Sequence, residues 1–141
     1  MLVSEGMTEA VLSIGPSHTL HEAAAAMREK RVGAAVVVDP EAQGPGVITE
    51  RDVLHAVARG QNPDDERVAD HMTAKLTFAE PGWSLEHAAQ TMIRGGFRHL
   101  VVVDGAEMVG ILSMRDIVRV WSGLGAACDV PEPARAGGAA P

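Results

Sequence analysis

The chain has 141 residues of globular composition, enough for one domain or for two very small ones that share a core. Its formal net charge of −7 argues against a general nucleic-acid-binding protein, which needs a basic face. The single Cys128 excludes an intrachain disulfide, and the absence of a signal-peptide pattern and of an apolar run near roughly 20 residues leads us to expect a cytoplasmic protein with no membrane contact.

The first predicted helix spans residues 20–30. Thr19 starts a T-x-x-E capping box with Glu22, in which each residue satisfies a free N–H of the first helical turn. The apolar residues that follow recur at helical spacing: Leu20, Ala23, Ala24 and Met27. The run is rich in alanine, so we expect a helix with a small apolar face that allows close helix packing.

A hairpin and a second helix follow. Residues 35–38 are a β-branched run, too short and too apolar for anything but a buried strand. A loop over residues 40–45 leads to a second strand at residues 47–49, which runs directly into a helix. The apolar positions of that helix are Val53, Leu54 and Val57.

After a polar linker at residues 60–65 and a short turn, the same elements recur. Ser84 caps the next helix, residues 85–94, but His87 replaces the carboxylate of the capping box. A strand at residues 100–103, a tight Asp-Gly turn, a strand at residues 111–113 and a last helix complete the series. The apolar positions of the last helix are Ile117, Val118 and Trp121.

The two halves are copies of one unit. Residues 3–39 align with 68–104 at a shift of 65, and residues 46–57 with 110–121 at a shift of 64, giving 15 identities in 49 pairs. A β-α-β-β-α unit of this size buries one side of its small sheet, and pairing two units face to face buries both sides. We therefore predict an α/β (α+β) fold in which two units, residues 3–62 and 66–122, pack by pseudo-two-fold symmetry. Residues 123–141 lack periodicity and are expected to form a disordered tail.

Two octads lie where a strand meets a helix. They are GVITERDV at residues 46–53 and GILSMRDI at residues 110–117, and both follow the pattern G-φ-φ-[T/S]-x-R-D-φ, where φ is apolar. With the Met-Thr pair that starts each copy, the VVVD strands and the tandem arrangement, the chain resembles the CBS-domain family, named after cystathionine β-synthase. The resemblance covers about residues 3–122 and implies a tandem CBS pair, or Bateman module.

The resemblance implies adenosine-containing ligands, such as AMP, ADP, ATP, S-adenosylmethionine or NAD(H), in clefts between the repeats. It implies that Asp52 and Asp116 accept hydrogen bonds from ribose hydroxyls, and that Thr49 and Ser113 contact ribose or phosphate. It also implies shared walls. The wall residues are Phe97, Arg98 and His99 for the Asp52 cleft, and Val32, Gly33 and Ala34 for the Asp116 cleft.

Physical chemistry is compatible with the roles that the resemblance implies. A helix N-terminus favours a carboxylate in its first turn and anions nearby, and Arg51 and Arg115 add a guanidinium beside each aspartate. Because only the Asp52 cleft has a cationic wall, we expect it to prefer the more highly phosphorylated ligand. If His99 points inward, its protonation near pH 6.5 would strengthen phosphate binding.

We thus expect a non-catalytic regulatory module that needs no cofactor and binds an adenine nucleotide or other adenosyl compound. We expect a homodimer that acts on an unknown effector protein. The alternative is a protein-interaction module with empty or structural clefts, in which Asp52 and Asp116 only cap helices and Arg98 and His99 are exposed strand-edge residues. No histidine has metal-ligand spacing, and no catalytic motif is present.

Overall fold

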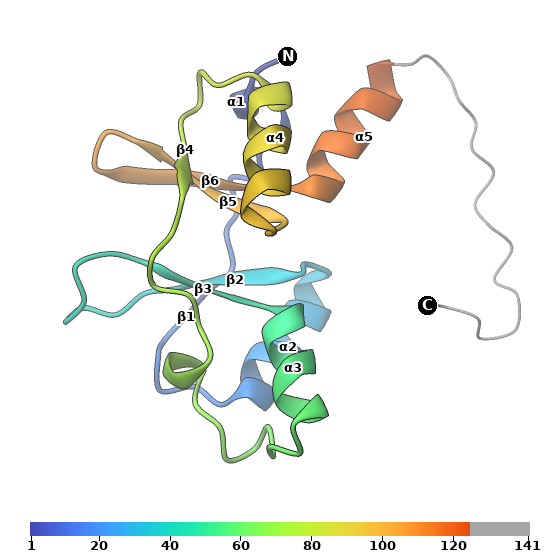
Figure 1. Ribbon diagram of the computed structural model, residues 1–141. Helices are drawn as coiled ribbons and strands as arrows, with labels where there is room; N and C mark the ends of the chain where they lie inside the picture. Colours follow the sequence, from blue (N-terminus) through green and yellow to red (C-terminus); the bar gives the residue numbers. More distant parts are fainter. Residues whose placement is uncertain (125–141) are drawn as a thin grey trace, which may run out of the picture.

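The computed structural model describes residues 1–124, which form two similar units joined by a linker (Figure 1). The first unit consists of α1 (Val3–Gly6), β1 (Ser13–Ile14), α2 (Leu20–Lys30), β2 (Ala34–Val37), β3 (Gly46–Thr49) and α3 (Glu50–Ala58). The second consists of the 3₁₀ helix η1 (Val68–Asp70), β4 (Phe78–Ala79), α4 (Leu85–Gly95), β5 (His99–Asp104), β6 (Glu107–Ser113) and α5 (Met114–Leu124).

Each unit has a three-stranded sheet of the same topology. The strand orders are β1-β2-β3 and β4-β5-β6, with the first pair parallel and the second antiparallel in each sheet. Figure 1 shows the two sheets in the middle of the molecule, with α2 and α3 on the outer side of one and α4 and α5 on the outer side of the other. The predicted fold of two β-α-β-β-α units packed face to face is confirmed.

The helix starts follow the predicted capping chemistry. The Thr19 hydroxyl accepts a hydrogen bond from the Glu22 N–H, and the Glu22 carboxylate accepts one from the Thr19 N–H, both at 3.1 Å. Ser84 caps α4 by accepting from the His87 N–H at 3.0 Å, with no carboxylate to complete a box. These caps fix the direction in which each helix leaves its sheet.

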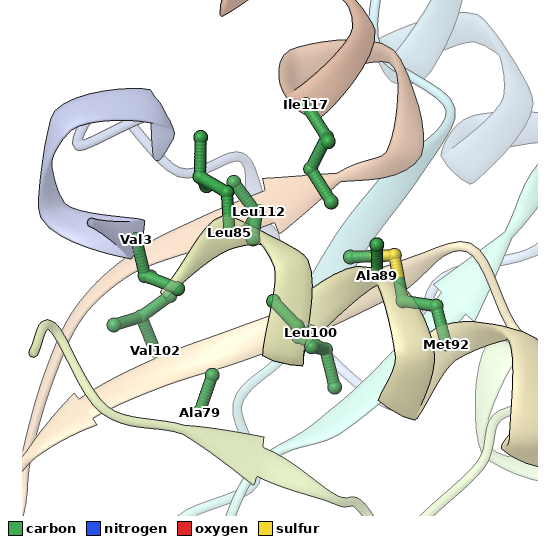
Figure 2. Close-up of a cluster of buried hydrophobic side chains, with 10 residues drawn as sticks. Val3, Ala79, Leu85, Ala89, Met92, Leu100, Val102, Leu112 and Ile117 are labelled. Carbon is green, nitrogen blue, oxygen red and sulfur yellow. The ribbon is translucent and has the colours of Figure 1, made fainter. Parts of the chain in front are cut away.

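Apolar side chains fill three clusters. One lies between each sheet and its own helices, and Figure 2 shows the cluster of the second unit, where side chains from α1, α4, α5 and the strands converge. The third lies between the two sheets and contains Ala34, Val36, Val47 and Val101. Strand alternation explains the division, since Leu100 and Val102 face the helices while Val101 faces the other sheet.

The start of each unit belongs physically to the other unit. Val3 of α1 is fully buried in the second unit's core, and Val68 of η1 in the first unit's core. The backbone of Thr8 exchanges hydrogen bonds of 2.8 and 3.0 Å with Ile111, and that of Thr73 exchanges two of 2.9 Å with Val47. Because each sheet depends on a segment of the other copy, the two units form one module.

The octad glycines allow this exchange. A Cβ on Gly46 would lie 2.9 Å from the Met72 sulfur, and a Cβ on Gly110 would lie 2.9 Å from the Thr8 carbonyl oxygen. Cβ atoms do not approach other atoms so closely without displacing them. The repeated glycine of one copy therefore packs against the repeated Met-Thr pair of the other copy.

The structure differs from the sequence prediction in the second hairpin and the last helix. Strand β6 begins at Glu107, four residues before the predicted start, because the two-residue loop after Asp104 is tight and its Gly105 has a φ of 64°. Helix α5 includes residues 123 and 124, and the rest of the predicted tail lies outside the described residues. No helix in residues 1–124 is long and apolar enough to cross a membrane.

Candidate functional site

A cleft of about 360 Å³ lies between the two units, and we call it the Asp52 cleft. Its walls come from the β3–α3 junction of the first unit and from two segments of the second. All six residues predicted for this site line it: Thr49, Arg51, Asp52, Phe97, Arg98 and His99. The segments meet because Thr73 pairs with Val47, which brings the start of the second copy beside the first octad.

Asp52 is half-buried in the first turn of α3 and uses one carboxylate oxygen for capping. The Thr49 N–H and hydroxyl donate to Asp52 Oδ2 at 2.8 and 3.0 Å, and the Asp52 N–H donates to Thr49 Oγ1 at 3.3 Å. No hydrogen bond from the described residues reaches Oδ1. Capping thus uses Oδ2 alone. Asp52 lines the cleft, and its Oδ1 is left free to accept a hydrogen bond.

The side chains that line the cleft carry more positive than negative charge. Arg51, Arg98 and the unpredicted Lys75 all line it, and none forms an ion pair within residues 1–124. Within residues 1–124 the Arg51 guanidinium donates one weak hydrogen bond, at 3.5 Å, to the Gly96 carbonyl. The one further carboxylate is that of Glu50, whose backbone N–H is held by the Gly33 carbonyl at 2.9 Å.

His99 lies on the inward face of β5, opposite Ser113 and on the same side as Val101. Burial lowers the pKa of His99 below its ordinary value of 6.5, while the carboxylates of Glu50 and Asp116 act in the opposite direction. The imidazole is therefore neutral at pH 7. The expected gain in phosphate binding near pH 6.5 moves to lower pH, although His99 does point inward.

The remaining wall is apolar and was not predicted apart from Phe97. This ring lies over the end of α4, where a Cβ on Gly95 would approach it to 1.9 Å, so the position admits only glycine while the ring stays there. Val47, Leu76 and Val101 also line the cleft. Sequence reasoning missed Lys75 and Leu76 because it did not predict that the Met-Thr segment crosses to the other copy.

The second predicted site is built differently. Asp116 is 5% exposed, and both of its carboxylate oxygens have partners. The Ser113 N–H donates to Oδ2 at 2.8 Å, and the Arg119 guanidinium lies 2.8 Å from Oδ1. In the first copy the position of Arg119 is His55, which makes no such contact.

A second hollow, of about 450 Å³, lies at the end of α2. Val32, Gly33 and Arg115 line it as the sequence predicted, but Ala34, Ser113 and Asp116 do not. Its other walls were unexpected, and we call it the arginine hollow because three of its residues are Arg28, Arg31 and Arg115. The structure thus does not bring the second set of predicted residues together around one opening.

Among residues 1–124, no group of three or more His, Cys, Asp or Glu side chains is placed to hold a metal ion. One polar cluster lies outside the clefts, beside the linker, and consists of Gln61, Glu66 and His71. Gln61 donates to the Glu66 carboxylate at 3.0 Å, and His71 lies 2.8 Å from it. This cluster fastens the linker to the turn before the second copy.

Comparison with known proteins gives one family. The family model for the CBS domain matches the chain twice, at residues 3–59 and 68–123. An uncharacterised protein of Methanocaldococcus jannaschii is 36% identical over 118 residues, which is 84% of this chain and 42% of that protein. One of Methanopyrus kandleri is 34% identical over 120 residues, or 84% of this chain and 61% of that protein. The chain therefore spans about half the length of these relatives.

Two solved structures have the same architecture over nearly the whole described chain. One is a putative signal-transduction protein with CBS domains from Burkholderia ambifaria, with a TM-score of 0.82, 27% identity, and coverage of 94% of this chain and 100% of that one. The other is a CBS domain protein from Pyrobaculum aerophilum complexed with AMP, with a TM-score of 0.73, 29% identity, and coverage of 87% and 99%.

Proposed function

The chain belongs to the CBS-domain family as a tandem pair, and we propose that it is a non-catalytic module that senses an adenosine-containing ligand in the Asp52 cleft. The observation that supports this most strongly is the free Oδ1 of Asp52 on the wall of a cleft with three cationic side chains. The Pyrobaculum aerophilum structure, which contains AMP, supports the same ligand class. In this proposal no cofactor is needed, and ligand occupancy acts on an unknown effector protein.

The ribose would bind at Asp52. A vicinal diol supplies two O–H donors, and Asp52 Oδ1 is the acceptor that the capping contacts leave unused. Thr49 holds the carboxylate in place through two hydrogen bonds to Oδ2, so the acceptor is oriented before the ligand arrives. A charge-assisted contact of this kind contributes about 1.5–3 kcal/mol, or roughly tenfold or more in affinity.

The base and the phosphates would use the remaining walls. Val47, Leu76 and Val101 offer an apolar surface for a planar purine. Arg51, Lys75 and Arg98 offer charge for phosphate oxygens, which supports the expectation that this cleft prefers ATP to AMP. The Asp116 carboxylate would have to break its ion pair with Arg119 before it could bind a second ribose.

The test is calorimetric titration of the protein with AMP, ADP, ATP, S-adenosylmethionine and NADH. We expect at least one of them to bind, and Asp52→Ala to weaken it about tenfold or more. Asp116→Asn is the matched control, since its carboxylate does not line the cleft, and it should change the affinity less than threefold. Absence of binding by all five compounds would contradict the proposal and favour the interaction module.

We also propose that the module forms a homodimer, but through different helices from those the sequence favoured. The small faces of α2 and α4 contain Ala23 and Ala88, which are fully buried in their own units, so they are unavailable to a second copy. Helices α3 and α5, which lie on the same side of Figure 1, instead carry four of the exposed apolar side chains: Leu54, Val57, Val118 and Trp121.

These four side chains form two equivalent pairs. Leu54 corresponds to Val118 and Val57 to Trp121 at the repeat shift of 64, so the pseudo-two-fold module presents the same apolar patch twice. A self-complementary surface of this kind suits an isologous dimer. Light scattering should give twice the chain mass at tens of micromolar, and Trp121→Glu should give the single mass; a monomeric parent protein would contradict the dimer.

A further inference from the structure

The end of helix α4 contains two consecutive glycines, and the backbone conformation explains only one of them. Gly96 has a left-handed φ of 71°, a conformation that glycine adopts without strain. Gly95 is the last residue of the helix and is not among the glycines with positive φ in residues 1–124. Because glycine is one of the least favourable residues in a helix, Gly95 calls for another reason.

The side chain of Phe97 supplies that reason. A Cβ on Gly95 would lie 1.9 Å from Phe97 Cε1, and 2.6 Å from both Cδ1 and Cζ of the same ring. The edge of the ring therefore occupies the space that the methyl group of an alanine would take. No side chain fits at position 95 unless the ring moves.

The first copy has the opposite combination of sizes. At the shift of 65, Gly95 corresponds to Lys30 and Phe97 corresponds to Val32. Helices α2 and α4 both have 11 residues, and a left-handed residue follows directly after each. This helix end thus accepts a side chain where the residue two positions later is a valine, and it has none where that residue is a phenylalanine.

The surroundings decide where a displaced Phe97 ring would go. On one side the ring packs against the core of the second unit, where Met92 and Leu100 are at most 1% exposed and close packing leaves no room for it (Figure 2). The Phe97 N–H donates to the Met92 carbonyl at 3.1 Å, which favours rotation of the side chain over a shift of the backbone. The open side is the Asp52 cleft, which both Gly95 and Phe97 line.

We propose that Gly95 is a positioning residue for the ligand of the Asp52 cleft. By lacking a side chain, it leaves room for the Phe97 ring at the end of α4 and so keeps the cleft wide enough for a purine nucleoside. A methyl group at position 95 would turn the ring into the space that the base needs. This inference rests on the proposed adenosine function, and it adds a residue that acts on the ligand only through Phe97.

Calorimetric titration with AMP tests the inference in four variants: Gly95→Ala, Phe97→Val, the double variant, and Gly82→Ala. We expect Gly95→Ala to weaken AMP binding about tenfold, a factor that corresponds to the usual cost of overpacking. In the Phe97→Val background, the same change should alter the affinity less than about threefold, because no ring remains to be displaced. Gly82→Ala is the matched control, since its Cβ would meet nothing within 4 Å, and it should bind as the parent does.

Two binding results would overturn the inference. One is a Gly95→Ala variant that binds AMP as tightly as the parent, and the other is an equal loss with and without the Phe97 ring. A thermal melt adds a readout that needs no ligand. The double variant should have a higher Tm than Phe97→Val, because alanine favours the helix where no ring opposes it. A lower Tm would show that the helix end itself requires glycine and would also overturn the inference.

Failure of the parent protein to bind AMP would count against the proposed function and not against the position of the ring. Crystals of ligand-free Gly95→Ala test that position separately. We expect the Phe97 ring to lie in the Asp52 cleft in these crystals. A ring that keeps its place, with the end of α4 displaced instead, would overturn the inference whatever the protein binds.

Discussion

Exchanging the residues that end α2 and α4 should change stability in opposite directions. Arg31 and Gly96 occupy equivalent positions, both left-handed, with φ of 56° and 71°. Arg31→Gly replaces the strained arginine with a residue that adopts this left-handed conformation without strain. Gly96→Ala introduces the strain, and its new Cβ would meet nothing within 4 Å, so the effect is conformational rather than steric.

The expected size follows from two opposing terms. A residue with a Cβ loses roughly 1–2 kcal/mol in the left-handed region. Glycine in turn loses about 0.4–1 kcal/mol because it makes the unfolded chain more flexible. The difference gives a gain of roughly 0.5–1 kcal/mol for Arg31→Gly and a loss of similar size for Gly96→Ala. For a chain of this size that is a Tm shift of about 2–4 °C in each direction.

Urea unfolding followed by circular dichroism measures both variants, with the slope m showing whether the unfolded states are comparable. A destabilised Arg31→Gly variant, or a Gly96→Ala variant as stable as the parent, would refute the reasoning. In that case contacts of the Arg31 side chain would outweigh the cost of its left-handed backbone conformation.

Three further predictions use the same unfolding assay. Gly110→Ala should destabilise the protein by about 1–3 kcal/mol, because its Cβ would press on a backbone carbonyl 2.9 Å away, whereas Gly44→Ala, with open space around it, should be near neutral. Arg119→Gln should cost about 1 kcal/mol by leaving the buried Asp116 carboxylate less satisfied, less than a fully buried pair because Arg119 is largely exposed; no change would show that the pair is immaterial. Acidification below about pH 6.5 should lower stability, since the unfolded chain binds a proton that buried His99 resists, and His99→Gln should remove that part of the slope. An unaltered slope in the variant would contradict the assignment.

Local patterns predicted the elements well, and they named residues that share one cleft. The capping box at Thr19, the VVVD strands and the octads are short-range signals; the structure has the box and the strand–helix junctions of the octads where predicted, with β2 one residue earlier than expected. The repeat added the pairing of two units, because a sheet with one covered side needs a partner. All six residues expected around Asp52 line one cleft for the same reason.

Pairing between segments that are far apart in the sequence could not be predicted from local patterns. No local pattern shows that Thr73 pairs with Val47 in the other copy, so Lys75 and Leu76 were not expected in the cleft. The two octads suggested equivalent sites, yet a single difference at the sixth residue of α5, Arg119 in place of His55, gives the second carboxylate an ion-pair partner. The spacing of Asp116 and Arg119 at i and i+3 was a readable signal of that pair.

The central claim is that the adenosine site is the Asp52 cleft and that the Asp116 carboxylate is not a second one. A crystal structure of the protein grown with saturating AMP tests it most directly. The account predicts one nucleotide per chain, with its ribose hydroxyls within hydrogen-bonding distance of Asp52 Oδ1 and with Arg119 still paired to Asp116. A ribose held by Asp116, or an Asp52 cleft that remains empty in such crystals, would contradict it.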